Sequence, residues 1–205
     1  MSKTSLFDPE NSFWSFLNRI FSIAYAGLLW FLLSLPIVTI GASTTALYSY
    51  AFSVAENREG YIGKTLFSSF RQHFVQATIL WLGMLVISGF LFFDAYLAST
   101  GTTLFSKMMF FMIVAVAIIL AMVFLHIFAL LSKGTLKNTQ LLRKAFVLGI
   151  GGLPISLTLL VLNVLFFWLV YLFPLTVVFG YGFVVVLSSL FVRVAYARSE
   201  ELHDI

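Results

Sequence analysis

The 205-residue sequence has no cysteine, and charged residues make up only 10% of it. Without cysteine the chain can form no disulfide, no thiolate metal site and no cysteine nucleophile. Soluble domains carry about 25% charged residues, so the few charges here cannot cover a surface that faces water. The composition therefore excludes an ordinary soluble domain and predicts that the surrounding solvent is lipid.

Chemical motifs are also scarce. Histidines and carboxylates do not cluster at metal-ligand spacing, and no glycine loop is followed by the lysine that binds phosphate in nucleotide sites. The abundant serines lie in no nucleophile motif. We therefore predict no catalytic residues, no cofactor and no metal, and we expect that the protein is not an enzyme. The net charge of +4 serves better as a topology signal than as evidence for a nucleic-acid partner.

Hydrophobic residues, in contrast, reach 61%, with 24 phenylalanines and a mean hydropathy of +1.04. No long polar linker divides the chain, which predicts one all-α, polytopic membrane bundle over residues 1–205. The first apolar run is far longer than the hydrophobic part of a signal peptide, so we expect it to remain in the mature protein.

The first apolar run, Ile20–Ala55, contains 36 residues and a break signal. As a helix it would measure about 54 Å, more than one crossing of about 30 Å but less than two crossings and a turn. Pro36 lacks a backbone donor and favours a break. The sequence predicts one crossing over about 18–35, a break at Pro36–Gly41 and a shorter helix to about residue 54, which could be re-entrant, interfacial or a continuation.

The remaining apolar runs predict four more crossings, at about 74–97, 107–132, 146–171 and 175–194, the last two separated by a turn around Pro174. Residues 61–74 and 137–146 mix cations with apolar residues at helical spacing, which predicts amphipathic helices at the inner face. Five crossings place the termini on opposite sides. An outside N-terminus puts nine lysines and arginines inside and three outside, so the positive-inside rule predicts N-outside and C-cytoplasmic. Two crossings in the first run would invert every later segment and oppose that rule.

Small and polar residues inside the apolar runs are the candidates for a site. Pro36, Gly41, Ser43, Thr44 and Thr45 are interpreted as a structural hinge that packs helices closely, with Thr39 or Ser43 able to cap the next helix. The alternative is a broken-helix binding site of the kind that transporters use. Three further residues could form an intramembrane polar site: His126, Asn163 and Asp94. Interhelical hydrogen bonding explains the first two more simply, and interfacial solvation explains Asp94.

Several of these residues also carry a family resemblance. The chain resembles the YesL-like family of small bacterial integral membrane proteins, a domain of unknown function. The matching segments are Phe13-Trp14-x-Phe16-Leu17-Asn18-Arg19, Leu29-Trp30, the block Leu35–Tyr48, Phe67-x-x-Phe70-Arg71-x-x-Phe74, Leu142-x-Lys144-Ala145 and Leu153-Pro154; Ala26 departs from an expected asparagine. The family brings no established catalytic residues.

The resemblance implies a plasma-membrane protein of Gram-positive type, often encoded beside carbohydrate uptake. We therefore expect an accessory or interaction component whose partners, besides the lipid bilayer, are a sugar ABC importer or a membrane sensor kinase. The alternative is a small-solute transporter or facilitator, which with so few crossings would work as a homo-oligomer.

Overall fold

The computed structural model describes residues 12–56, 61–134 and 137–201, and every regular element in them is helical. In chain order these are α1 (Ser12–Ser34), the 3₁₀ turn η1 (Ile37–Thr39), α2 (Ile40–Ala55), α3 (Ile62–Thr100), α4 (Leu104–Ser132), α5 (Asn138–Gly151), α6 (Leu153–Leu172) and α7 (Thr176–Glu201). This confirms the predicted all-α bundle.

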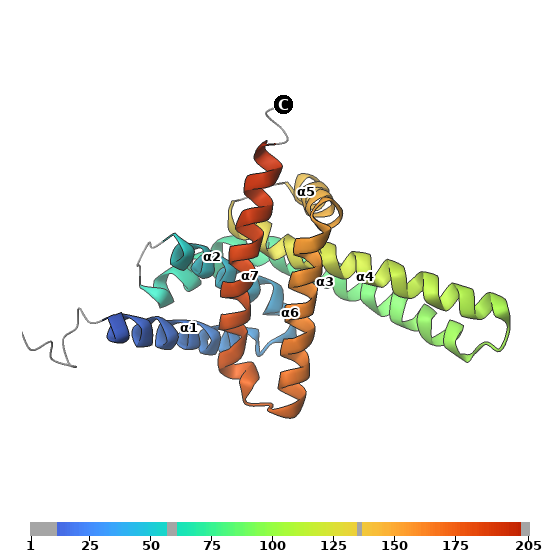
Figure 1. Ribbon diagram of the computed structural model, residues 1–205, viewed down its shortest axis with the longest axis horizontal. Coiled ribbons are helices and arrows are strands. Elements are labelled where there is room, and N and C mark those ends of the chain that lie inside the picture. Colours follow the sequence, from blue (N-terminus) through green and yellow to red (C-terminus); the bar gives the residue numbers. More distant parts are fainter. Residues whose placement is uncertain (1–11, 57–60, 135–136, 202–205) are drawn as a thin grey trace, which may run out of the picture.

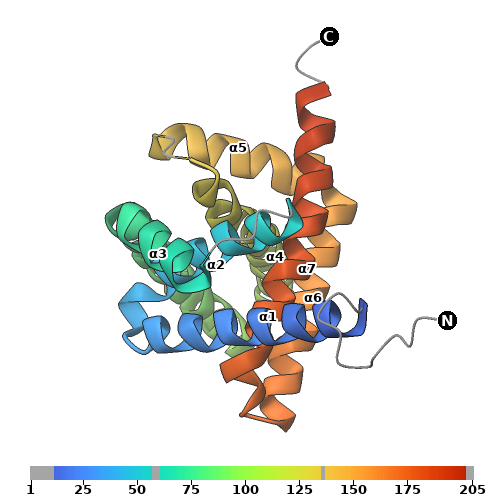
Figure 2. The same cartoon turned by 90° about the vertical axis from the view of Figure 1, so that its left-hand side faces the viewer.

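The first apolar run breaks where proline predicts. Helix α1 ends at Ser34, Pro36 is extended with φ −75° and ψ 116°, and α2 begins at Ile40 after η1. Proline and the residue before it disfavour a continuing helix. The break turns the chain back, and α2 packs against α1, α3, α4 and α7. The second half of the run is therefore the central helix of the bundle (Figures 1 and 2).

Six helical segments among the described residues are long and apolar enough to cross a membrane, whereas the sequence predicts five crossings. The additional one is Ile37–Ala55, of which 61% of the most apolar window is buried inside the protein. A helix that faces lipid along its whole length must span about 30 Å of hydrocarbon by itself. A helix surrounded by other helices escapes that requirement, because protein rather than lipid covers its backbone.

The structure also corrects several predicted boundaries. Residues 62–73 do not form a separate surface helix but the first three turns of α3, a continuous helix of 39 residues. That helix runs on to Thr100, so most of the predicted polar connection after Asp94 is helical. The predicted crossing from residue 146 begins instead at Leu153, because the chain turns at Gly152 between α5 and α6. The turn around Pro174 lies where predicted.

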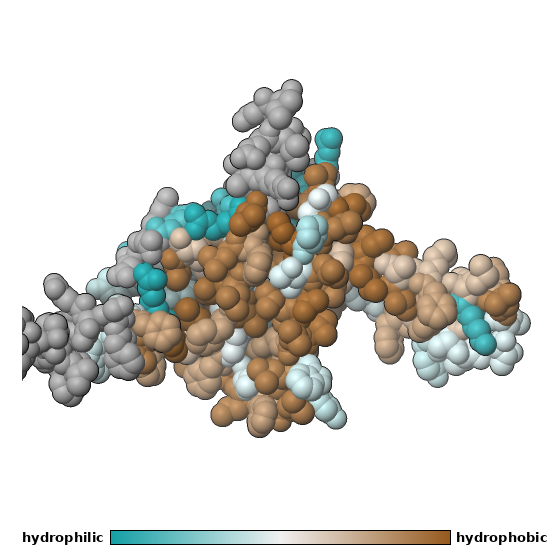
Figure 3. Space-filling view, viewed as in Figure 1, coloured by the Kyte–Doolittle hydropathy of each residue, from teal (hydrophilic) through white to brown (hydrophobic). Residues whose placement is uncertain are grey.

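The helices fall into a packed centre and a projecting hairpin (Figure 1). Helices α3 and α4 extend side by side away from the centre, and their buried residues all lie in the parts nearer α2, up to Met84 in α3 and from Met122 in α4. Beyond these positions the hairpin exposes large apolar side chains such as Phe92 and Phe111. Apolar surface also covers α6 and α7, whereas hydrophilic residues gather near α5 and at the hairpin tip (Figure 3).

This apolar exterior indicates contact with a lipid bilayer. Mixed surface occurs on α5, which buries Leu141, Ala145 and Leu148 and exposes Arg143 and Lys144. Exposed apolar residues such as Phe146 lie beside these cations, which is the composition of a helix at the membrane–water boundary. The helix is therefore amphipathic as predicted.

Candidate functional site

The break places its small polar residues in the protein interior. Gly41, Ser43, Thr44 and Thr45 all lie in α2 and are buried, while Pro36 remains exposed at the turn. At such a depth each hydroxyl needs a hydrogen-bond acceptor, because neither lipid nor an apolar core supplies one.

These hydroxyls find their acceptors close by. The Thr45 Oγ1 donates to the Gly41 carbonyl at 2.9 Å, and the Ser43 Oγ lies 2.5 Å from the Ser34 Oγ of α1. The Trp30 Nε1 of α1 donates to the Thr44 Oγ1 at 3.1 Å. Ser43, Thr44 and Thr45 thus bond to their own helix or fasten it to α1.

The predicted side-chain cap at the start of α2 is wrong. Thr39 is the N-cap residue, but its hydroxyl makes no cap hydrogen bond to α2. It donates backward, to the Leu33 carbonyl at 2.6 Å and the Pro36 carbonyl at 2.7 Å. The carbonyls at the end of α1 lack helical partners because Pro36 interrupts the helix, and Thr39 satisfies one of them.

Glycine at position 41 permits a close helix crossing. A Cβ added to Gly41 would lie 2.7 Å from the Ala77 carbonyl oxygen and 2.7 Å from the Trp81 Cβ, both in α3. Helices in membranes approach closely where small residues face each other. Position 41 therefore needs glycine for the packing of α2 against α3.

The three residues of the predicted intramembrane polar site do not form a common site. His126 is fully buried in α4, with its Nδ1 2.9 Å from the Met122 carbonyl oxygen. Asn163 in α6 donates to the Leu159 carbonyl at 2.9 Å. Asp94 is exposed in the distal part of α3, where the hairpin has left the packed centre. The first two bond within their own helices, and the third lies in a separate region.

A different set of residues lines a polar cavity of ≈ 500 Å³ between the end of α2, the start of α3 and the end of α4. Its buried wall contains Ser69 and His73, which are 7% and 3% exposed. Lys64, Ser68 and Gln72 are exposed at the rim. The complete described lining is Ser49, Lys64, Thr65, Ser68, Ser69, Gln72, His73, Ser132, Lys133 and Gly134.

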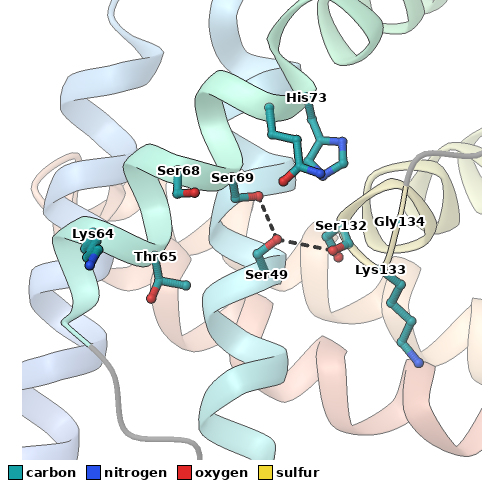
Figure 4. Close-up of a pocket in the computed structure, with 10 residues that line it drawn as sticks. Ser49, Lys64, Thr65, Ser68, Ser69, His73, Ser132, Lys133 and Gly134 are labelled. Atoms are coloured by element: carbon teal, nitrogen blue, oxygen red, sulfur yellow. Dashed lines mark hydrogen bonds between the residues drawn. The ribbon is translucent and has the colours of Figure 1, made fainter.

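Hydrogen bonds between three serines join the walls of this cavity (Figure 4). The Ser49 Oγ of α2 lies 2.7 Å from the Ser69 Oγ of α3 and also donates to the Ser132 carbonyl of α4 at 3.3 Å. The Nδ1 of His73 is buried and has no hydrogen-bond partner within the described part of the chain. The cavity therefore combines a fixed hydroxyl network with a buried histidine nitrogen that has a hydrogen bond still to make.

Lys133 lines the cavity with the stem of its side chain and directs its ammonium away from it (Figure 4). The Nζ lies 4.0 Å from the centroid of the Tyr196 ring and 4.9 Å from that of Phe52, both cation–π distances. Burial raises the pKa of the Tyr196 phenol above its ordinary value, so the ring next to the lysine stays neutral at physiological pH. Lys133 thus ties the end of α4 to α2 and α7.

The apolar periodicity of residues 61–74 does not reveal this cavity. The apolar residues at helical spacing in 61–74 are Leu66, Phe67, Phe70 and Phe74; Leu66 is fully buried, yet Phe67 and Phe74 are exposed, at 59% and 36%. The polar residues Thr65, Ser69 and His73, spaced four apart, point inward instead. The spacing of these three polar residues was the signal in the sequence that could have indicated the cavity. In a membrane protein the apolar side of a helix can face lipid, so the polar side faces the protein interior.

The fold and exterior together define a multi-span helical membrane protein. Over residues 23–95 the chain matches the family described as "Protein of unknown function, DUF624", which confirms the resemblance to the YesL-like family. The matched segment runs from within α1 through α2 and most of α3, so it includes both the break and the α3 wall of the cavity. Comparison with curated proteins and with solved structures finds no match.

Proposed function

We propose that the protein is a non-enzymatic plasma-membrane component that binds other molecules at its cytoplasmic face, as an accessory of bacterial carbohydrate uptake or its sensing. The distribution of its polar groups supports a binding role. The deep hydroxyl of Thr45, the amide of Asn163 and the Nδ1 of His126 hydrogen-bond to carbonyls of their own helices, while the His126 Nε2 is buried with no partner among the described residues. The polar cavity lies instead where α3 begins and α4 ends, and the cations Arg143 and Lys144 lie on the exposed side of α5.

The distribution of lysines and arginines supports a cytoplasmic N-terminus in place of the predicted outside N-terminus. Six crossings return the chain to the side on which it started, so both termini lie on one face. With that face cytoplasmic, eleven of the twelve lysines and arginines are inside and only Lys107, at the hairpin tip, is outside. The conflict with the positive-inside rule disappears once the N-terminus moves inside as well.

Single cysteines test this orientation cleanly, because the natural chain has none. We expect that Ser99→Cys, near the end of α3, reacts with a membrane-impermeant maleimide on intact cells. Thr139→Cys, in the first turn of α5, should react only after the cells are permeabilised. Labelling of Thr139→Cys on intact cells would overturn the orientation.

The partners of the proposed accessory role are components of a sugar ABC importer or a membrane sensor kinase. The support for this class is the family resemblance, and the mixed basic and apolar outer face of α5 offers a surface for contact. The test is affinity purification from cross-linked native membranes, with the partners identified by mass spectrometry. Recovery of an importer or kinase component with the wild type, and a several-fold smaller recovery with Arg143→Glu/Lys144→Glu, is the expected result.

Lys107→Glu is the matched control for that experiment, since it changes a cation at the tip of the α3–α4 hairpin, away from α5 (Figure 1). It should leave recovery unchanged. An equal loss with Lys107→Glu, or no importer or kinase component in the wild-type sample, would contradict the accessory role.

The alternative, a facilitator for small solutes that acts as a homo-oligomer, is supported by one observation: the cavity is polar and bordered by three helices. Proteoliposomes that hold the purified protein and are offered radiolabelled sugars distinguish the two roles. The accessory role predicts uptake equal to that of empty liposomes, and uptake above that level would favour the facilitator.

A further inference from the structure

We infer that the cavity between α2, α3 and α4 is a binding site for a phosphate group, carried either by a lipid headgroup or by a small soluble ester. This goes beyond the accessory role and does not depend on it. Three properties of the cavity lead to the inference: its donors, its buried histidine and its position on α3.

The lining supplies hydrogen-bond donors and positive charge. The hydroxyls of Ser49, Ser69 and Ser132 are committed to one another and to backbone carbonyls, but the hydroxyls of Thr65 and Ser68 and the ammonium of Lys64 also line the cavity. Among the described lining residues none is acidic. Anionic oxygens form stronger hydrogen bonds with such donors than neutral oxygens do. Carboxylates in the lining would repel an anion. Because the described lining has none, its charge favours the binding of an anion.

The buried Nδ1 of His73 is an independent sign of a ligand. The residue is 3% exposed and lines the cavity, yet this nitrogen has no partner in the described part of the chain. Leaving a buried donor unsatisfied costs free energy that a ligand atom can recover. In the tautomer that carries its proton on Nδ1, the imidazole would donate to a phosphate oxygen in the cavity.

The start of α3 adds to the attraction. Lys64 and Thr65 lie in the first turn of this 39-residue helix, whose N-terminus carries no side-chain cap. The backbone N–H groups of a first turn lack helical acceptors, and the helix dipole gives that end a partial positive charge. The lining thus offers an anion the side-chain donors of α3 and lies beside the positive end of that helix.

Other ligand chemistries fit less well. A hard metal ion is bound by carboxylate and carbonyl oxygens, and the described residues contain no cluster of three histidines or acidic residues for a metal. An uncharged sugar gains from stacking on an aromatic ring, and the described lining contains none. The cavity volume of ≈ 500 Å³ exceeds that of a phosphate ion, which leaves room for the glycerol or other group esterified to it.

Native mass spectrometry of the full-length protein in uncharged detergent tests the site. The lipid arm compares dioleoyl phosphatidylglycerol with dioleoylglycerol, which shares the acyl chains and lacks the phosphate. The soluble arm measures sn-glycerol 3-phosphate against glycerol by calorimetry. Selective binding of phosphatidylglycerol alone identifies a headgroup site, and binding of sn-glycerol 3-phosphate identifies a site for soluble esters. Either result supports the inference.

Substitutions then assign the binding to the cavity. Lys64→Gln removes an exposed cation without touching the core, and Lys144→Gln on α5 is the matched control outside the cavity. We expect Lys64→Gln to weaken phosphate binding about tenfold, the effect of losing one charge-assisted hydrogen bond, and Lys144→Gln to leave it unchanged. His73→Gln, with its shorter reach, should weaken binding as well.

Three results would overturn the inference. The first is binding in neither arm above the phosphate-free comparison. The second is an equal loss with Lys64→Gln and Lys144→Gln, because general attraction to a basic surface would produce it. The third is binding of the uncharged glycerol as strongly as of its phosphate ester. Retention of the wild-type melting temperature by Lys64→Gln ensures that each result concerns a folded protein.

Discussion

Two groups of hydroxyl-bearing residues lie within this bundle, and they differ in how completely their hydrogen bonds are made. In the first turns of α2, Ser43, Thr44 and Thr45 are buried and bonded to α1 or to their own helix. At the cavity, Ser69 bonds across to Ser49, but the neighbouring His73 nitrogen has no partner in the described region. Polar residues whose hydrogen bonds are all made within the protein hold helices together. A buried polar group in a cavity that lacks a hydrogen-bond partner indicates a place for a ligand.

The largest effect on stability is expected from Gly41→Ala, which would disturb the packing of α2 around Ser43, Thr44 and Thr45. The added Cβ would meet the Ala77 carbonyl at 2.7 Å, and backbone cannot move aside as a flexible side chain can. Overpacking of this kind costs about 1–3 kcal/mol of unfolding free energy. Denaturation in mixed detergent micelles measures the loss. Gly83→Ala on the same helix pair is the control, since nothing lies within 4 Å of its added Cβ; equal losses would contradict the close crossing.

A smaller effect is expected from Thr45→Val, which keeps the shape of the side chain and removes its hydrogen bond to the Gly41 carbonyl. Side-chain hydrogen bonds in membrane bundles average about 0.6 kcal/mol, so the same denaturation experiment should show a loss near that value. Thr158→Val provides the comparison, because its hydroxyl bonds to the Pro154 carbonyl on an exposed surface. A stabilised Thr45→Val protein would show that the buried hydroxyl does not help to hold α2.

The smallest effect on stability is expected from Ser69→Ala at the cavity. Water in the cavity can replace the lost partner of the Ser49 hydroxyl, so the unfolding free energy should change by less than about 0.5 kcal/mol. Phosphate binding should nevertheless fall several-fold in the calorimetric experiment. A change in stability as large as that of Gly41→Ala, without a change in phosphate binding, would show that Ser69 holds the helices together and does not bind the ligand.

The sequence was sufficient to predict the helical membrane fold, the break at Pro36 and the turn at Pro174, because these depend on local chemistry: apolar length and the missing donor of proline. It did not predict that Ile40–Ala55 becomes the central helix, since burial by α1, α3, α4 and α7 is a property of the tertiary packing. The cavity escaped prediction for the same reason, because Ser49, Ser69 and Ser132 are far apart in the chain and meet only in the folded bundle.

The unbroken course of α3 has a mechanical consequence. A helix of 39 residues is a rod of about 58 Å, with His73 near one end and Asp94 near the other. From His73 to Thr100 the helix measures about 40 Å, so a pivot of about 10° at the cavity would carry Thr100 through about 7 Å. The inner wall of the cavity and the tip of the hairpin thus belong to one continuous helix, with no break between them.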